Sequence, residues 1–316
     1  MSRYRHLSID ERESILSMRA QGLSITQMAA ALSRSPSTVS RELKRHPGDY
    51  SPHAAQEAYL ARRPRRKPLL ADQRLRDVVE MMLHLFLSPE QIENRLRLER
   101  AKTVSYATIY RALDKGLITP ALRRHLRIKY KPYRRKRKDR SGQIPVDLWI
   151  DDRPEAVNNR EEFGHWESDT IESKKGGVAM VTHVERKSRF TVAAFMPKKN
   201  AENYRVATIE CLSGLPAGAV RSFTVDHGKE FARYRELQEH WGALVYFAHT
   251  GCPWERGTNE NTNGLLRQWF PRRKDLASFS DQELLEALAL LNHRPRKCLG
   301  WKTPYEVFFH TSLHFT

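Results

Sequence analysis

Three carboxylates occupy positions in the sequence where functional groups are commonly found. Asp169 lies in a strand-like run at residues 165–171. Asp226 directly follows a short apolar strand, and Glu260 lies where a helix is predicted to begin. Open α/β sheets place their functional groups at the carboxyl ends of strands, and carboxylate oxygens suit hard cations such as Mg²⁺. We therefore predict Asp169, Asp226 and Glu260 as the candidate catalytic residues.

The residues around Glu260 follow helical spacing. Arg256, Asn263 and Arg267 lie at −4, +3 and +7 from it. If the helix extends that far, these side chains share one face with the carboxylate. Two guanidinium groups and an amide would then lie beside the acidic site, where such groups bind phosphates. The alternative for Arg256 is a simple role at the start of the helix.

Other polar residues near these acids have plainer explanations. Glu167 lies two residues before Asp169, so its side chain points to the same face of a strand. It is either a ligand or a supporting group, and we favour support. We expect Glu230 to form a salt bridge or to face solvent. His165 and His227 adjoin the acids and are expected to be structural.

The acids lie in a segment with alternating elements. From about residue 144, three strand-like runs are followed by helix and strand in turn. This order predicts an α/β domain with a mixed sheet. The predicted strands are 164–171, 178–185, 190–195, 220–225 and 244–248, and the predicted helices are 201–212, 229–241, 259–270 and 281–292.

The sequence of the N-terminal region predicts a helix-turn-helix. Helices are predicted at residues 9–20 and 24–32, and a third begins at Ser35-Pro36, where Ser suits the N-cap and Pro the first helical position. Such a helix enters the major groove with its N-terminal residues at base edges. The predicted DNA-contacting residues are Ser37, Thr38, Ser40, Arg41 and Lys44.

A similar pattern recurs further along the chain. Ser88 caps one predicted helix, and Ser105 caps another that carries Thr108 and Arg111 on its candidate DNA-reading face. This resembles a second helix-turn-helix. The alternative is an ordinary helical hairpin.

The charge is concentrated in the N-terminal part. The net charge is +18, from 55 Lys and Arg against 37 Asp and Glu. Residues 1–140 hold 32 basic and 14 acidic residues, and residues 141–316 hold 23 of each. Such an excess predicts a polyanionic partner, most often nucleic acid. The run at 129–140 adds further predicted DNA contacts at Arg134, Arg135, Lys136 and Arg137.

These features divide the chain into four predicted segments. They are a helix-turn-helix domain at 1–60, a basic linker with a second helical domain at 61–128, a basic linker at 129–144 and a catalytic domain at 145–316.

The three cysteines are odd in number and lack zinc-site spacing, so neither a disulfide framework nor a zinc ribbon is expected. The most apolar stretch is too short to span a bilayer.

Four ordered motifs resemble one family. GHWESDTI at 164–171, TVDHGKEF at 224–231, PWERGTNENTNGLLRQWFP at 253–271 and LNHRPRKCLGWKTPYEVF at 291–308 are similar to the DDE transposases of the bacterial insertion-sequence-30 family. The 33 residues between Asp226 and Glu260 match that family's spacing. The resemblance covers about residues 145–310, and the N-terminal helix-turn-helix also fits. His227, Ser168 and Arg273-Lys274 depart from residues frequent in the family.

The resemblance implies an RNase H-like core that holds two Mg²⁺ ions on Asp169, Asp226 and Glu260, with Mn²⁺ able to substitute. It implies recognition of the terminal inverted repeats of a mobile element, cleavage at its ends, and strand transfer into target DNA. Two metals about 3.5–4 Å apart suit an in-line displacement at phosphorus. An oligomer, at least a dimer on DNA, and a bacterial cytoplasmic, nucleoid-associated location without membrane contact are further expectations.

Two other functions remain open from the residues alone. One is a DNA-binding regulator with an inert core, which binds repeat ends without metal-dependent nicking. The other is a nuclease of RNase H type that acts on RNA–DNA hybrids, although that leaves both sequence-reading modules unexplained.

Overall fold

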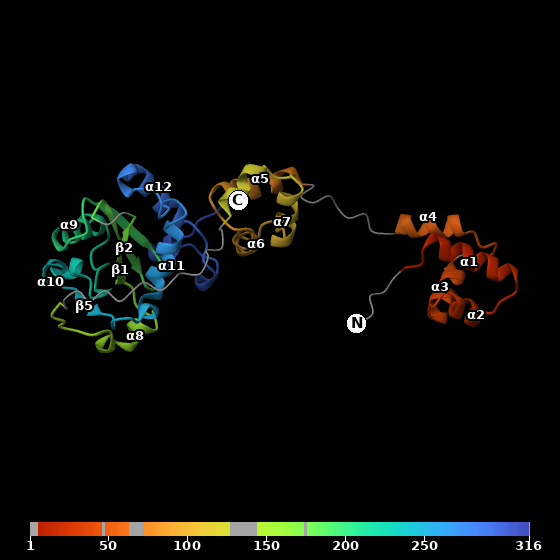
Figure 1. The fold of residues 1–316 in the computed structure, drawn as a ribbon, viewed down its shortest axis with the longest axis horizontal. Helices are drawn as coiled ribbons and strands as arrows, with labels where there is room; N and C mark the ends of the chain where they lie inside the picture. Colours follow the sequence, from red (N-terminus) through yellow and green to blue (C-terminus); the bar gives the residue numbers. More distant parts are fainter. Residues whose placement is uncertain (1–5, 46–47, 63–71, 127–143, 174–175, 316) are drawn as a thin grey trace. The chain divides into compact units, whose positions relative to one another are not determined.

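The computed structural model describes residues 6–45, 48–62, 72–126, 144–173 and 176–315. The predicted contacts at Arg134, Arg135, Lys136 and Arg137 lie outside these residues. The chain forms two compact units, Met1–Pro68 and Leu69–Thr316, which are described separately (Figure 1). In the ranges that the structure describes, no helix has both the length and the apolar character needed to cross a membrane.

The first unit is a small helical domain. Its helices are α1 (Ile9–Ala20), α2 (Ile25–Ala31), α3 (Pro36–Arg45) and α4 (Pro52–Arg62). The first two begin at capping boxes on Ser8 and Ser24, which satisfy backbone donors that a helix start leaves unpaired. Ile15, Met28 and Val39 form part of the buried core. The predicted helices of the helix-turn-helix are present, and α4 was not predicted.

The second unit begins with a helical module, residues 72–126. It contains α5 (Gln73–His84), α6 (Pro89–Leu98), α7 (Tyr106–Asp114) and the 3₁₀ helix η1 (Pro120–His125). Ser88 and Ser105 cap α6 and α7 as predicted. The module has its own apolar core, which includes Val79, Ile92 and Ile109.

A five-stranded sheet follows in the order β3-β2-β1-β4-β5. The strands are β1 (His165–Glu172), β2 (Ala179–Glu185), β3 (Thr191–Met196), β4 (Ser222–Val225) and β5 (Leu244–Phe247). β1, β2 and β3 pair antiparallel, whereas β4 and β5 continue parallel to β1. The predicted mixed sheet is confirmed.

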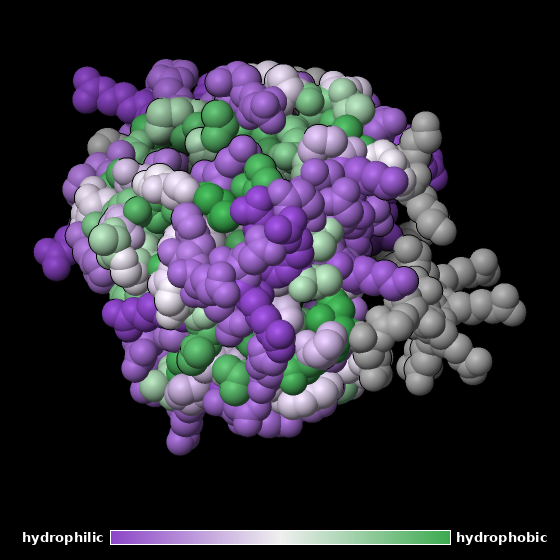
Figure 2. Space-filling model, turned by 90° about the vertical axis from the view of Figure 1, so that its left-hand side faces the viewer, coloured by the Kyte–Doolittle hydropathy of each residue, from purple (hydrophilic) through white to green (hydrophobic). Residues whose placement is uncertain are grey.

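Helices cover both faces of this sheet. α9 (Ala201–Leu212) and α10 (Tyr234–Trp241) share one core with the strands, and α11 (Gly257–Leu266) and α12 (Asp281–Asn292) share the other. Because strand side chains alternate, Glu167 and Asp169 point to the α11 side with Ile171. Seen from the side of α9 and α10, hydrophilic side chains cross the middle of the surface between more apolar areas (Figure 2).

Short elements complete the domain. They are η2 (Ile150–Asp152), α8 (Glu155–Asn158), η3 (Lys229–Phe231), η4 (Pro253–Arg256), η5 (Leu276–Ser278), η6 (Lys297–Leu299) and α13 (Pro304–Phe308).

Two predicted helices differ in extent. The predicted helix at 229–241 is divided into η3 and α10. The predicted helix at 259–270 begins two residues earlier and ends at Leu266. Hydrogen bonds from Gln268 and Trp269 to residues three positions back tighten its last turn, and Pro271 disfavours helical geometry at the residue before it.

Candidate active site

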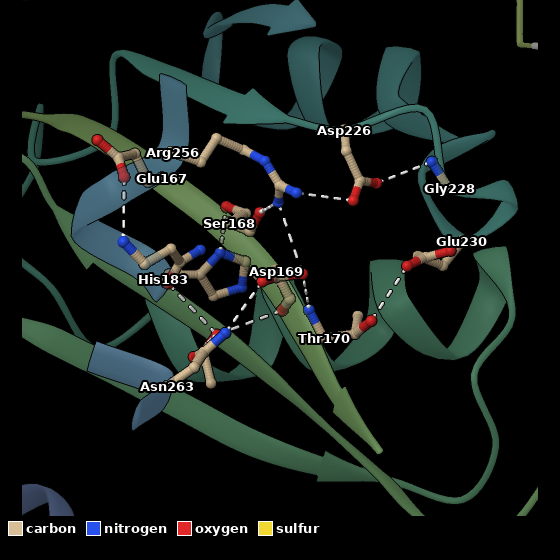
Figure 3. A network of polar contacts seen from close by, with 12 residues as sticks. Glu167, Ser168, Asp169, Thr170, His183, Asp226, Gly228, Glu230, Arg256 and Asn263 are labelled. Atoms are coloured by element: carbon tan, nitrogen blue, oxygen red, sulfur yellow. Dashed lines mark hydrogen bonds and ion pairs between the residues drawn. The ribbon is translucent and has the colours of Figure 1, made fainter. Parts of the chain in front are cut away.

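Asp169 and Asp226 are brought together by the pairing of β1 with β4. His165 lies beside Ser222 and Glu167 beside Thr224 in this parallel pair. Two residues further on, the same offset places Asp169 next to Asp226, just past the end of β4. Figure 3 shows the two carboxylates facing one another across the guanidinium of Arg256.

Arg256 links both carboxylates from the end of η4. Its Nη2 lies 2.7 Å from Asp226 Oδ2, and its Nη1 lies 3.5 Å from Asp169 Oδ1. Nη1 also donates to the carbonyl oxygen of Ser168 at 3.2 Å. The Arg256 side chain is only 15% exposed, so its charge acts with little screening by water. The predicted position of Arg256 beside the acids agrees with these contacts, although it precedes α11 rather than lying within it.

Asn263 fixes the other side of Asp169. Its Nδ2 donates to Asp169 Oδ2 at 3.0 Å, and its Oδ1 accepts from the hydroxyl of Thr182 at 3.0 Å. Thr182 was missed in the sequence, although it stands directly opposite Asp169 in the β1–β2 register. On Asp226, the N–H of Gly228 donates to Oδ1 at 2.8 Å. Both aspartates are therefore held in defined orientations.

The charge state of Asp169 reflects its surroundings. Burial raises the pKa of its carboxyl, the positive charge of Arg256 lowers it, and the negative charge of Asp226 raises it again. The net direction is upward. A cation bound beside Asp169 would favour the charged form of its carboxylate.

The two aspartates have the chemistry of a metal site. Carboxylate oxygens of the two aspartates converge on one positive charge, the guanidinium of Arg256. A divalent cation requires hard oxygen ligands that converge in this way. Glu260 lies on α11 with its side chain exposed. Among the described residues, no group of three or more His, Cys, Asp or Glu is close enough to hold a metal. Glu260 therefore stays a prediction as the third ligand.

Glu167 supports the start of α11. Its Oε2 accepts from the backbone N–H groups of Thr258 at 3.0 Å and Asn259 at 3.1 Å, and its Oε1 forms a buried ion pair with Arg186. The carboxylate thus satisfies donors that the helix start leaves unpaired. This arrangement agrees with the supporting role favoured from the sequence.

The other polar neighbours of the site make contacts with residues around it. Glu230 is buried and pairs with Lys199 at 2.8 Å, as expected. His165 Nδ1 lies 2.8 Å from the hydroxyl of Ser222, and burial lowers the pKa of its imidazole. The ring of His227 packs between Trp149 and Phe247. Arg267 Nη2 donates to the carbonyl oxygen of Glu172 at 2.8 Å.

The predicted DNA-reading residues lie on accessible helix faces. On α3, Ser37, Arg41 and Lys44 are exposed and Thr38 and Ser40 are half-buried. On α7, Arg111 is exposed, and the half-buried Thr108 has its hydroxyl 2.9 Å from that of Ser105. These placements leave the side chains available to a groove, and their contacts with bases stay predictions.

Comparison with known proteins agrees with this architecture. A helix-turn-helix domain family matches residues 3–46, and an integrase core domain family matches residues 159–253. The chain is 38% identical to a transposase, InsI, of insertion sequence element IS30A from Escherichia coli (strain K12), covering 96% of this chain and 83% of that one. It is 37% identical to the transposase of element IS1086 from Cupriavidus metallidurans (97% and 95%) and 34% identical to that of IS4351 from Bacteroides fragilis (96% and 95%).

A helix-turn-helix domain followed by an integrase core defines a DNA-binding protein of the polynucleotidyl transferase class. Within that class, the identity to these relatives extends over nearly the whole chain. The chain belongs to the insertion-sequence-30 family of transposases.

Proposed function

We propose that this protein binds the terminal inverted repeats of its own mobile element, cleaves the DNA at the element ends, and joins the freed 3′-hydroxyl to target DNA. The observation that carries the proposal is the pair Asp169–Asp226, which the parallel pairing of β1 with β4 brings together around one positive charge. Recognition falls to residues 1–60 and 61–128, with added phosphate contacts from 129–144, and chemistry falls to residues 145–316.

The reaction consists of two displacements at phosphorus. Water attacks a phosphodiester at the element end and releases a 3′-hydroxyl, which then attacks a target phosphodiester and releases a target 3′-hydroxyl. Asp169 and Asp226, with Glu260 as the proposed third ligand, would hold two Mg²⁺ ions, or Mn²⁺ in their place. When bound, the ions stabilise charge on the entering and leaving oxygens. Asn263 orients the carboxylate of Asp169.

The assembly on DNA is part of the proposal. Cleaving and joining two element ends together requires two copies of the core, so we expect at least a dimer on DNA. The site of action is the cytoplasm, on the bacterial nucleoid.

The test is a cleavage and joining assay with a labelled repeat-end duplex and Mg²⁺. Asp169→Asn, Asp226→Asn and Glu260→Gln should each lower the rate by at least about a hundredfold, as expected when one strong electrostatic contribution is lost. Glu239→Gln, an exposed carboxylate on α10, should leave the rate unchanged.

Binding of the repeat end is measured in parallel. Variants that bind normally but no longer cleave support the proposal. It fails if the aspartate variants cleave and join as the wild type does. Binding of the wild type without nicking would instead identify a regulator, and cleavage confined to RNA–DNA hybrids would identify a nuclease of RNase H type.

A further inference from the structure

A small cavity of about 200 Å³ lies beside the start of α11 and has an unusual lining. Three of its side chains are arginines and none is acidic. The lining residues are Arg160, Arg189, Gly257, Thr258, Asn261, Thr262, Arg296 and Cys298. Because the arginines come from three separate segments, the cavity is formed by the tertiary fold and not by one charged stretch of sequence.

Two of these arginines converge on one hydroxyl. Arg189 Nη1 lies 3.0 Å from Thr258 Oγ1, and Arg160 Nη2 lies 3.4 Å from the same atom. Both residues have left-handed backbones, with φ of 65° and 63°. Such conformations cost about 1–3 kcal/mol each and persist only where the surrounding structure imposes them. The turn after α8 and the connection between β2 and β3 therefore bring both guanidinium groups to the same hydroxyl.

The electrostatics of this cavity are unfavourable without an anion. Burial lowers the pKa of Arg160, and the neighbouring charge of Arg189 lowers it further. The nearby carboxylate of Glu167 also acts on Arg160, but it is already committed to Arg186 and to the start of α11. Positive charge in the cavity thus exceeds the negative charge that the fold supplies.

We propose that this cavity binds a phosphate group of the DNA strand that runs past the active site. Guanidinium groups are the preferred partners of phosphate, because several of their N–H donors match its oxygens. The inference rests on the proposed function and extends it, since it names where the protein holds the DNA backbone beyond the reacting phosphodiester.

The geometry of α11 connects the cavity with the aspartates. At 100° per residue, Thr258 and Thr262 lie about 140° and 100° around the helix from Asn263, which contacts Asp169. The exposed residues Glu260 and Asn261 lie between these two faces. A strand crossing the exposed side of α11 therefore passes from the aspartates to the arginine cavity.

Cys298 provides a direct probe, because its exposed thiol lines the cavity. The full-length protein is alkylated with and without a 40-base-pair duplex, and modification of Cys298 is followed by peptide mass spectrometry. With the duplex at ten times its dissociation constant, alkylation of Cys298 should slow by about tenfold. Inorganic phosphate, added at the same total phosphate concentration, should protect far less.

The variant Arg160→Gln/Arg189→Gln tests whether the arginines cause this protection. With the duplex again at ten times that variant's own dissociation constant, Cys298 should be alkylated equally fast with and without DNA. The matched variant Arg205→Gln/Arg235→Gln, which removes a half-buried arginine from α9 and an exposed one from α10, should keep the protection. Thermal unfolding of both variants is measured to check that the fold is intact.

Three outcomes would overturn the inference. One is unprotected Cys298 in the wild type with duplex bound, and another is full protection in the folded Arg160→Gln/Arg189→Gln variant. The third is equal protection by inorganic phosphate, which assigns the cavity to the free anion. Asp169→Asn should retain the protection of Cys298 even though it abolishes joining. A failure of the proposed phosphate site can therefore be distinguished from a failure of the proposed function.

Discussion

At the scale of single residues, Arg256 is the positive charge that holds the two aspartates together. Its guanidinium contacts Asp226 at 2.7 Å and approaches Asp169 at 3.5 Å. Without this guanidinium, the two neighbouring carboxylates would repel one another. The positive charge of Arg256 would repel a divalent ion bound by the two aspartates. The arginine and the ion would therefore compete for the same carboxylate oxygens.

This competition makes a prediction about metal affinity. Arg256→Gln should bind Mn²⁺ more tightly, because even in water two unit charges 4 Å apart interact by about 1 kcal/mol. The dissociation constant should fall by at least roughly fivefold. Titration calorimetry measures it without reference to catalysis. Arg221→Gln, an exposed arginine of the same domain, is the control, and an affinity equal to the wild type's would show that the guanidinium does not occupy the cation's place.

At the scale of elements, the position of α11 decides the geometry of the site. The helix contributes Asn263, and the segment just before it contributes Arg256. Its first turn is fixed to β1 by the two hydrogen bonds that Glu167 accepts. The same strand thus carries Asp169 and the residue that anchors the helix facing it.

Replacement of this anchor should destabilise the domain. In Glu167→Gln, Arg186 loses its buried ionic partner, which costs about 3–5 kcal/mol when one member of such a pair is removed. Urea unfolding followed by tryptophan fluorescence is a suitable measurement, because all six tryptophans lie in the second unit. Glu286→Gln, an exposed position on α12, should change the free energy of unfolding little. A loss no larger than this control's would show that Glu167 does not anchor α11.

Elements were easier to predict from the sequence than the contacts between them. The strands follow from short strand-like runs, and α12 begins at its capping box on Ser280, both of which are short-range patterns. The role of Glu167 depends on Thr258, 91 residues away, and the arginine cavity joins residues from four segments. Their positions in and after predicted strands singled out Asp169 and Asp226 as candidates but not Thr182, because a threonine opposite a carboxylate is recognisable only once the strand register is known.

At the scale of the whole second unit, an ion-pair network joins the helical module to the C-terminal end of the chain. Arg95 on α6 is buried and pairs with Glu306 of α13 and with Glu99. Gln91 Nε2 also donates to the carbonyl oxygen of Pro295 at 2.7 Å, and the ring of Phe86 packs 5.4 Å from that of Trp269. These contacts fix the module against the domain that carries the aspartates.

The network should make the stability of this unit depend on acid. Burial alone would raise the pKa of Glu306, but the bonds from Arg95 and from the N–H groups of Leu313 and Thr303 outweigh it and hold the pKa at about 2. A carboxyl with a lowered folded-state pKa stabilises the fold fully above its ordinary value of 4.5 and loses that contribution as the pH falls toward 2. The contribution is at most about 3 kcal/mol.

The difference between the wild type and Glu306→Gln isolates this contribution from other titrations. The free energy of unfolding of the wild type should exceed that of Glu306→Gln by a constant amount from pH 7 to about pH 5. The difference should then shrink steadily between pH 4.5 and pH 2, because protonation of Glu306 removes the charge that Arg95 pairs with. Urea unfolding at several pH values, again with tryptophan fluorescence, measures it. A difference that stays constant down to pH 2.5 would contradict a charged Glu306 as the partner that binds the helical module to the domain.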